Sequence, residues 1–209
     1  MTVVTIDGPA GSGKSTVARN VADRLGMEML DTGAMYRSVT LAVLRSGADP
    51  TDGEAAGAAA AELELRMENQ RVWVNGSDAT DEIRSAEVSD AVSVVSAHPA
   101  VRTVLRDLQR HWMASRQGGV VEGRDIGTVV FPDAEVKVFL VAAPDVRASR
   151  RAQQGGVDES EAATNIATRD RLDATRADSP LTEPDGALRI DTSELTIDQV
   201  VDRIVEVVR

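Results

Sequence analysis

The chain has 209 residues with a formal net charge of −11, 42% hydrophobic and 27% charged residues, and no cysteine. This length allows one α/β domain with a small appendage, and the lack of cysteine excludes a disulfide framework and a thiolate metal site. The acidic balance disfavours a surface that binds nucleic acid through its phosphates. No apolar run approaches the roughly 20 residues that span a bilayer, and the N-terminus lacks the pattern of a signal peptide. We therefore expect a cytoplasmic protein with neither a nucleic-acid nor a membrane partner.

A glycine-rich segment at residues 8–16 stands between a predicted strand and a predicted helix. The β-branched run Val3–Ile6 precedes it, and Val17 and Val21 follow at helical spacing, before a possible left-handed cap at Gly26. The segment matches the phosphate-loop pattern, in which two glycines with four residues between them are followed by Lys and Ser. We expect it to bind a nucleoside triphosphate, ATP in the kinase interpretation reached below, through the residues Gly8, Pro9, Ala10, Gly11, Ser12, Gly13, Lys14, Ser15 and Thr16.

Two side chains of this segment carry specific chemistry. Lys14 is expected to reach the β- and γ-phosphates, and the Ser15 hydroxyl is expected to bind Mg²⁺. Lys14 and Lys137 are the only lysines of the chain, and all other cationic side chains apart from histidine are arginine. An otherwise arginine-based sequence thus keeps lysine where a compact ammonium group is needed.

The segments that follow alternate between strands and helices. The patterns predict a short strand at 27–30, a helix after 31–37 that runs to Leu44, a short helix at Glu54–Ala61, and a hairpin at 63–74 with its turn at Asn69. Because this hairpin is an antiparallel element within an alternating strand and helix pattern, we place a small insert at about 48–90.

The second half of the chain continues the alternation. We predict a helix from Asp81 to about Ala97, a helix from Pro99 that Gly118 and Gly119 end, strands at Val120–Val121 and Val136–Val141, and a helix from Pro144. After these come a flexible joint at 153–156, a loosely packed helix pair at 158–176, a strand at Leu188–Ile190, and a final helix behind the capping box Thr196–Gln199.

Five strand candidates separated by helices predict an α/β fold with a parallel sheet and helices on both faces. Ligands of such sheets bind beyond the carboxyl ends of the strands. The phosphate loop, residues 31–37 and residues 122–127 all follow predicted strands, so we expect them to meet in one cleft.

Three classes of phosphate-loop protein compete. A GTPase is disfavoured because no Asn-Lys-x-Asp motif occurs, and the ATPase of a larger machine is disfavoured because Val120-Val121-Glu122 matches its metal-binding strand only weakly. A kinase of small molecules needs arginines from several segments to hold two phosphorylated substrates. This chain supplies Arg37, Arg124, Arg147, Arg150, Arg151, Arg169 and Arg176.

Three motifs together resemble bacterial cytidylate kinases. They are Ile6–Thr16, the sequence Leu-Asp-Thr-Gly-Ala-Met-Tyr-Arg at 30–37, and Glu-Gly-Arg-Asp-Ile-Gly-Thr-Val-Val-Phe-Pro at 122–132. Residues 82–84, 94–102 and 169–176 add to the resemblance, which covers nearly the whole chain. It implies a phosphate-loop fold with a five-stranded parallel core (about 1–47, 91–150 and 177–209), a nucleoside-monophosphate-binding insert (about 48–90) and an arginine-bearing lid (about 151–176).

The same resemblance implies an ATP-dependent phosphotransferase that converts CMP or dCMP to the diphosphate, with Mg²⁺ as cofactor. It assigns catalytic roles to Lys14, Arg124, Arg151 and Arg169, with Arg147 also in the lid. It assigns substrate binding to Asp31, Tyr36, Arg37, Ser93, Arg102, Arg124, Asp125, Asp173 and Arg176. Arg37 and Arg124 would hold the CMP phosphate, Ser93, Arg102 and Asp125 would recognise cytosine, and Asp173 with Arg176 would contact the sugar. We expect a monomer.

Several alternatives stay open at this point. Arg147, Arg150 and Arg151 could form a solvated helix face, and Asp173 with Arg176 could be an ordinary surface pair. Other candidate functions are a different nucleoside-monophosphate kinase, such as a UMP/CMP-type enzyme, and a phosphate-loop module without transfer activity. The lid segment looks shorter and richer in Gly and Ala than in many relatives, so its arginine assignments have the least support.

Overall fold

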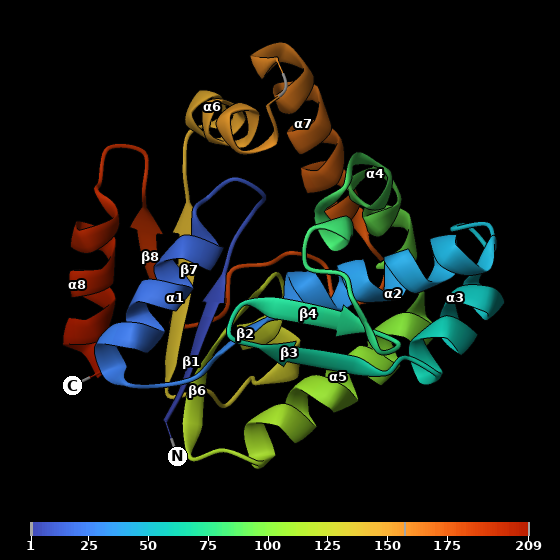
Figure 1. The fold of residues 1–209 in the computed structure, drawn as a ribbon. Helices are drawn as coiled ribbons and strands as arrows, with labels where there is room; N and C mark the ends of the chain where they lie inside the picture. The colour runs from blue at the N-terminus through green and yellow to red at the C-terminus, as the bar shows by residue number, and fades with distance from the viewer. Residues whose placement is uncertain (1, 157, 209) are drawn as a thin grey trace. The chain divides into compact units, whose positions relative to one another are not determined.

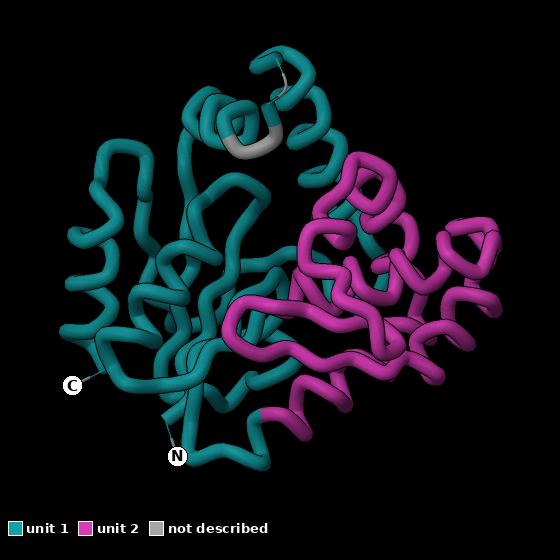
Figure 2. Tube along the Cα trace, in the orientation of Figure 1, with its two compact units in different colours: residues 1–31, 113–209 teal, residues 32–112 magenta. Residues whose placement is uncertain are grey.

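The computed structural model describes residues 2–156 and 158–208. The chain forms two compact units, Met1–Asp31 with Met113–Arg209, and Thr32–Trp112 (Figure 2). We call them unit 1 and unit 2, as in the figure. Within the described ranges, no helix combines the length and the apolar character needed to cross a membrane.

Unit 1 is built on a five-stranded sheet with the strand order β2-β6-β1-β7-β8 (Figure 1). The strands are β1 (Thr2–Asp7), β2 (Met29–Asp31), β6 (Gly118–Gly123), β7 (Val136–Val141) and β8 (Leu188–Asp191). Every neighbouring pair is parallel. The predicted parallel five-stranded sheet is therefore confirmed.

Unit 1 contains two helices that pack on the sheet through apolar residues, the first and the last, and two that contact mainly each other. They are α1 (Lys14–Leu25), α6 (Pro144–Gly155), α7 (Glu159–Thr175) and α8 (Ile197–Val208). Val17 and Val21 of α1 and Val201 of α8 are fully or nearly fully buried with Val4 and Leu140 of the sheet. Figure 1 shows α1 and α8 side by side, in blue and red, against this core.

Two short-range predictions in unit 1 are confirmed in detail. Gly26 ends α1 in the left-handed conformation with φ 65°. Before α8, the backbone N–H of Thr196 donates to Gln199 Oε1 at 2.9 Å, and the backbone N–H of Gln199 donates to Thr196 Oγ1 at 3.2 Å. This is the reciprocal pair of bonds that defines a capping box.

Unit 2 contains a small antiparallel sheet and helices. Its elements are α2 (Thr32–Ser46), α3 (Gly53–Ala61), β3 (Leu65–Glu68), β4 (Arg71–Val74), β5 (Ser77–Asp78), the 3₁₀ turn η1 (Glu82–Arg84), α4 (Ala86–Val95) and most of α5 (Pro99–Ala114). The sheet order is β3-β4-β5. Leu41, Val72, Val74, Ile83 and Val88 form its core. The predicted hairpin is present, and the two-residue strand β5 extends it.

Several predicted boundaries are wrong. The helix expected from Asp81 is interrupted at Ser85, whose side chain accepts a hydrogen bond from the Val88 N–H and caps α4. The strand expected at 27–30 is β2, Met29–Asp31. Gly118 and Gly119 do not end α5 but begin β6, where Gly118 pairs with Thr2 at φ 139°.

The region from 153 to 176 also differs from the prediction. Instead of a flexible joint, α6 runs through residue 155, and Gly156 caps it at φ 62°. Instead of a helix pair, residues 159–175 form one helix, α7. The segment holds no Gly or Pro after residue 156, and Asp158 caps its start by accepting from the Ser160 N–H at 2.8 Å, so nothing interrupts the helix.

Candidate active site

The phosphate loop connects β1 to α1 and requires glycine for steric reasons. A Cβ atom at Gly8 would lie 2.1 Å from the Leu140 carbonyl oxygen, so no other residue fits there. Gly11 and Gly13 have φ values of 75° and 89°, and Gly13 stands directly before α1. The loop is thus curled at the N-terminus of a helix, where backbone N–H groups and the helix dipole favour an anion.

Lys14 begins α1 and is buried with its ammonium group on the loop. Its Nζ donates to the Pro9 carbonyl at 2.7 Å. Burial, followed by repulsion from Arg124, lowers the pKa of Lys14 to about 7, while the carboxylates of Glu122, Asp173 and Asp7 act in the opposite direction. A desolvated cation held in this way can neutralise phosphate charge without first losing a water shell.

The hydroxyl of Ser15, the residue after Lys14, contacts a carboxylate of strand β6. The Ser15 hydroxyl donates to Glu122 Oε1 at 2.5 Å, and Glu122 lies at the end of β6. Burial, with a contribution from Asp31 at the end of β2, raises the pKa of Glu122 to about 7, while Lys14 lowers it. A hydroxyl and two carboxylates thus converge beside the phosphate loop.

Arg124 connects the segment after β6 to the end of α7. Its Nε donates to Asp173 Oδ2 at 2.9 Å. Arg176 Nη1 lies 3.5 Å from Asp173 Oδ1, and Arg176 Nη2 donates to the Ser179 carbonyl at 2.6 Å. The side chains of Asp173 and Arg176 are only 13% and 5% exposed, so the alternative of an ordinary surface pair is wrong.

The arginines of α6 also have partners. Arg147 Nη1 donates to the Ala10 carbonyl of the phosphate loop at 3.1 Å and to Asp170 Oδ2 of α7 at 2.5 Å. Arg150 donates to the hydroxyl and the carbonyl of Thr192, at 2.9 and 2.7 Å. A solvated helix face is therefore the wrong interpretation for these two arginines.

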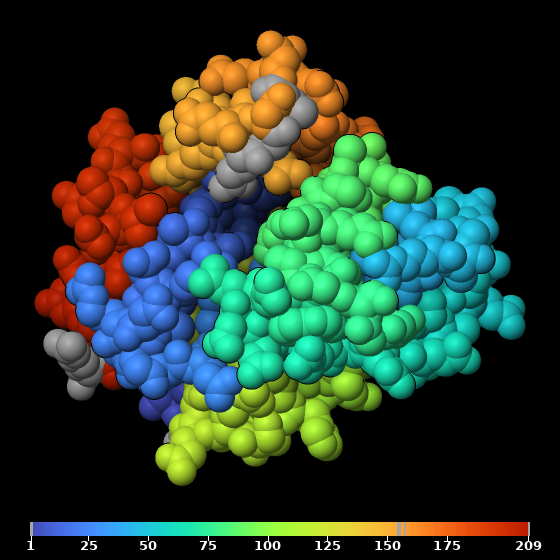
Figure 3. All heavy atoms as spheres, in the orientation of Figure 1, coloured from blue at the N-terminus to red at the C-terminus, as the bar shows by residue number. Residues whose placement is uncertain are grey.

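The contact of α6 with the phosphate loop is also visible on the surface. In Figure 3 the orange atoms of α6 and α7 lie beside dark-blue atoms of the N-terminal segment, as the bond between Arg147 and Ala10 requires. Arg151 on α6 and Arg169 on α7 are half-buried. Unit 1 thus brings Arg147 of the predicted lid to the phosphate loop.

Unit 2 holds the other predicted substrate-binding residues. Arg37 Nη1 donates to the Ile83 carbonyl at 3.1 Å and to Ser89 Oγ at 2.9 Å. The guanidinium of the buried Arg102 lies 5.5 Å from the ring centroid of Tyr36, within the range of a cation–π contact. Ser93 is half-buried on α4. The structure therefore pairs Arg102 with Tyr36 and connects Arg37 to the start of α4.

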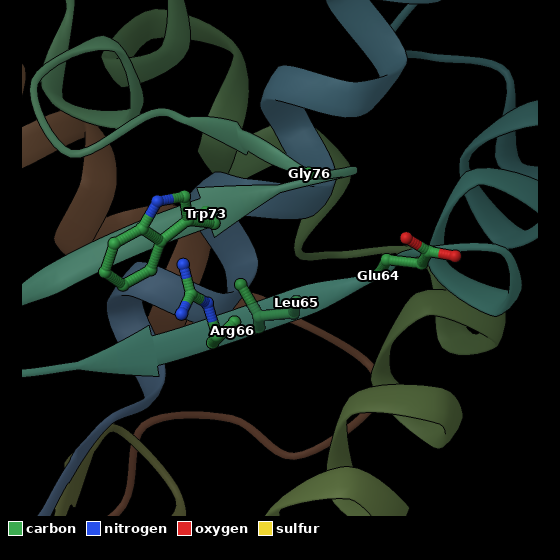
Figure 4. A pocket seen from close by; sticks show the side chains of 5 residues that line it. All are labelled: Glu64, Leu65, Arg66, Trp73 and Gly76. Carbon is green, nitrogen blue, oxygen red and sulfur yellow. The ribbon is translucent and has the colours of Figure 1, made fainter.

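A separate hollow of about 300 Å³ lies on the small sheet of unit 2 (Figure 4). The Arg66 guanidinium lies 3.6 Å from the ring centroid of Trp73, while the Glu64 carboxylate points away from the pair. Its five lining residues, Glu64, Leu65, Arg66, Trp73 and Gly76, include none of the predicted site residues.

Comparison with known proteins decides the family. The sequence model described as "Cytidylate kinase" matches residues 4–209. The chain belongs to the cytidylate kinase family. A cytidylate kinase of Mycobacterium leprae (strain Br4923) is 49% identical over 212 residues, covering 99% of this chain and 95% of that protein. One of Mycolicibacterium paratuberculosis (strain ATCC BAA-968 / K-10) is 51% identical over 217 residues, with the same coverage. The resemblance drawn from the motifs is therefore confirmed.

A solved structure supports the fold alone. The crystal structure of a gluconokinase from Sinorhizobium meliloti 1021 matches with a TM-score of 0.54 at 15% identity, covering 99% of this chain and 91% of that chain. A shared phosphate-loop kinase architecture at such low identity says nothing of the substrate.

Within this cytidylate kinase family member, motif reasoning missed three acidic residues of the site. Asp7 accepts hydrogen bonds from the N–H groups of Ile126 and Gly127, at 2.9 and 2.7 Å. Asp170 holds Arg147, and Glu122 accepts from Ser15. The sequence did contain signals for two of them, since Asp7 and Glu122 both end apolar strands at the sheet edge where ligands bind.

Proposed function

We propose that this protein transfers the γ-phosphoryl group of ATP to CMP or dCMP, giving ADP and CDP or dCDP. The observation that carries the proposal is membership of the cytidylate kinase family over residues 4–209, joined to an intact phosphate loop. The named relatives at about half identity are cytidylate kinases over 95% of their length.

We assign ATP binding to residues 8–16. Their backbone N–H groups would surround the phosphates, and Lys14 would exchange the Pro9 carbonyl for phosphate oxygens. The fixed loop geometry and the buried ammonium support this assignment.

The residues beside the loop fit Mg²⁺. A hydroxyl from Ser15 and carboxylates from Glu122 and Asp31 are oxygen donors of the type that Mg²⁺ prefers, and phosphates and water would complete its shell. Within the described residues no group of three or more His, Cys, Asp or Glu side chains could hold a metal ion. When bound, the metal would neutralise charge on the phosphates.

We assign CMP binding to the residues that the family resemblance indicates. Arg37 and Arg124 would hold the CMP phosphate, because a guanidinium binds two oxygens at once. Ser93, Arg102 and Asp125 would recognise cytosine, whose amino donor and ring acceptors match a carboxylate, a hydroxyl and an Arg. The pairing of Asp173 and Arg176 near Arg124 supports their assignment to the sugar, and Tyr36 would form a wall of the site.

We also propose a division into core, insert and lid. The insert at about 48–90 lies within unit 2, and the lid at about 151–176 comprises α7 and the end of α6. Arg151 and Arg169, with Arg147, would contact the transferring phosphoryl group. Closure of the lid would exclude water, which would otherwise accept the phosphoryl group.

The reaction needs no strong general base. The attacking oxygen of CMP is already anionic, so positioning and charge neutralisation supply most of the rate enhancement. The buried Lys14 and the half-buried Arg124 fit this requirement. A cytoplasmic location and a monomeric state stay predictions.

A panel of acceptors tests the proposal. ADP release is measured with ATP and Mg²⁺ against CMP, dCMP, UMP, AMP, GMP and dTMP, with EDTA as the control for metal dependence. We expect turnover with CMP and dCMP far above the others. Turnover centred on another monophosphate would overturn the base-recognition residues, and ATP binding without any turnover would identify a module without transfer activity.

A further inference from the structure

Asp7 is the last residue of the central strand β1 and is fully buried. It pairs with Gly123 of β6 on one side and with Phe139 of β7 on the other. No motif assigned it a role, yet it directly precedes the phosphate loop. A carboxylate in such a place needs compensation for its lost hydration.

The compensation comes from a turn 119 residues away in sequence. Residues Ile126–Val130 form a wide helical turn in which the N–H groups of Val129 and Val130 donate to the Asp125 carbonyl, at 2.9 and 3.2 Å. The first N–H groups of any helical turn have no acceptor within it. In this turn the N–H groups of Ile126 and Gly127 are the first two, and Asp7 accepts both: Ile126 N–H at Oδ1 and Gly127 N–H at Oδ2.

The turn also packs closely on β1. A Cβ atom at Gly127 would lie 2.8 Å from Thr5 Oγ1 and 3.3 Å from Asp7 Oδ2. Gly127 therefore has no room for a side chain while the two hydrogen bonds to Asp7 are in place. The contact fixes the distance between the strand that leads into the phosphate loop and the turn that follows Arg124 and Asp125.

We infer that Asp7 is a positioning residue that holds Arg124 and Asp125 in register with the phosphate loop. It acts through the Ile126–Val130 turn and touches neither substrate. The expected effect on turnover with CMP rests on the proposed function, whereas the role of Asp7 in holding the turn does not. A displacement of about 1 Å at a substrate-positioning group can lower the rate by about a hundredfold, so the two hydrogen bonds matter for turnover.

The two bonds fit only the ionised form of Asp7. Both oxygens accept an N–H, whereas a protonated carboxyl group would turn one of them into a donor. Burial raises the pKa of Asp7 to about 6, and repulsion from Asp125 adds to this, while the two N–H groups and Lys14 act in the opposite direction. The turn is therefore held at pH 7 to 8 and released as Asp7 gains a proton in more acidic solution.

The first test follows hydrogen exchange and is independent of activity. Asp7→Asn keeps the shape but places an NH₂ group against one of the two N–H donors. We expect the amide protons of Ile126 and Gly127 to exchange at least tenfold faster than in the wild type, with those of Val201 and Ile204 in α8 unchanged. Asp23→Asn, the same change on an exposed residue of α1, is the control. Unchanged exchange at Ile126 and Gly127 would overturn the inference.

The second test separates positioning from general damage. For Asp7→Asn, kcat/KM for CMP should fall at least tenfold while the dissociation constant for ATP stays within about twofold. Equal losses for CMP and ATP would contradict the role. If Asp7→Asn does not fold, Gly127→Ala provides the same test, because its added Cβ would push the turn away from Thr5 and Asp7. It should give the same CMP-specific loss of kcat/KM. Wild-type kinetics for Gly127→Ala would overturn the inference. A wild type inactive with CMP would instead refute the proposed function and leave the exchange test valid.

Discussion

Replacement of Lys14 by methionine should abolish transfer and at the same time stabilise the fold. Burial lowers the pKa of this lysine from 10.5 to about 7. At about 1.4 kcal/mol per pKa unit, the folded state loses at most roughly 5 kcal/mol by holding the ammonium group charged. Methionine has a similar length without the charge.

The net gain should be smaller than this bound, because Glu122 attracts Lys14 and loses that partner in the variant. We expect about 1–3 kcal/mol, as for other buried charged groups replaced by apolar ones. For a chain of this size that corresponds to a rise of about 2–12 °C in Tm. The loss of a preorganised cation at the phosphates should lower kcat by a factor of at least about 100.

The pH dependence has a definite sign. When folding lowers the pKa of a lysine, its free-energy penalty on the folded state is complete below the folded pKa. This penalty disappears as the pH rises toward the unfolded value of 10.5. The Tm difference between Lys14→Met and wild type should therefore be largest near pH 7 and shrink by pH 10. Thermal denaturation at both pH values and a coupled ADP assay measure the two effects.

Lys137→Met, which removes the only other lysine, is the matched control. It should leave kcat and the pH dependence close to wild type. A Lys14→Met protein that melts below wild type at pH 7 would refute the desolvation argument, and one with near wild-type turnover would refute the role of Lys14 in transfer.

Three further predictions concern other buried groups. Arg176→Ala should weaken CMP binding more than ATP binding and lower Tm, because the Ser179 carbonyl loses its donor; calorimetric titration of each nucleotide decides this, and a loss for ATP alone would contradict the sugar assignment. Glu122→Gln should raise the Mg²⁺ concentration for half-maximal activity by about 10–100-fold, as for other groups that orient metal ligands, and an unchanged Mg²⁺ titration would remove Glu122 from the metal site. Gln109→Met should raise the free energy of unfolding by about 1–3 kcal/mol, since both polar atoms of this buried amide have no hydrogen-bond partner in the described part of the chain. Urea denaturation measures this, and a lower stability of the variant would show that the amide is hydrogen-bonded in solution.

Features encoded by neighbouring residues were predictable. The phosphate loop, the Thr196–Gln199 capping box and the cap at Gly26 each depend on residues within one or two turns. The five strands were recognisable because buried parallel strands are continuous apolar runs. The length of α7 was not, because its polar sequence shows no apolar face from which to judge whether the helix continues.

The polar contacts of the site could not be read from spacing. Asp7 and Ile126 are 119 residues apart, and Ser15 and Glu122 are 107 apart. Which strand ends become neighbours depends on the strand order, and β1 lies between β6 and β7 only in the folded sheet. Likewise, spacing alone left a surface pair open for Asp173 and Arg176, and only the fold places Arg124 beside Asp173.

The most direct test of the account follows the phosphoryl group itself. ATP labelled with ³²P in its γ-phosphate is incubated with the protein, Mg²⁺ and CMP, and the products are separated by chromatography. We predict that the label appears in CDP, with little in inorganic phosphate and none in CDP when Lys14 is replaced by methionine. Label released only as inorganic phosphate, whether or not CMP is present, would contradict the assignment as a cytidylate kinase.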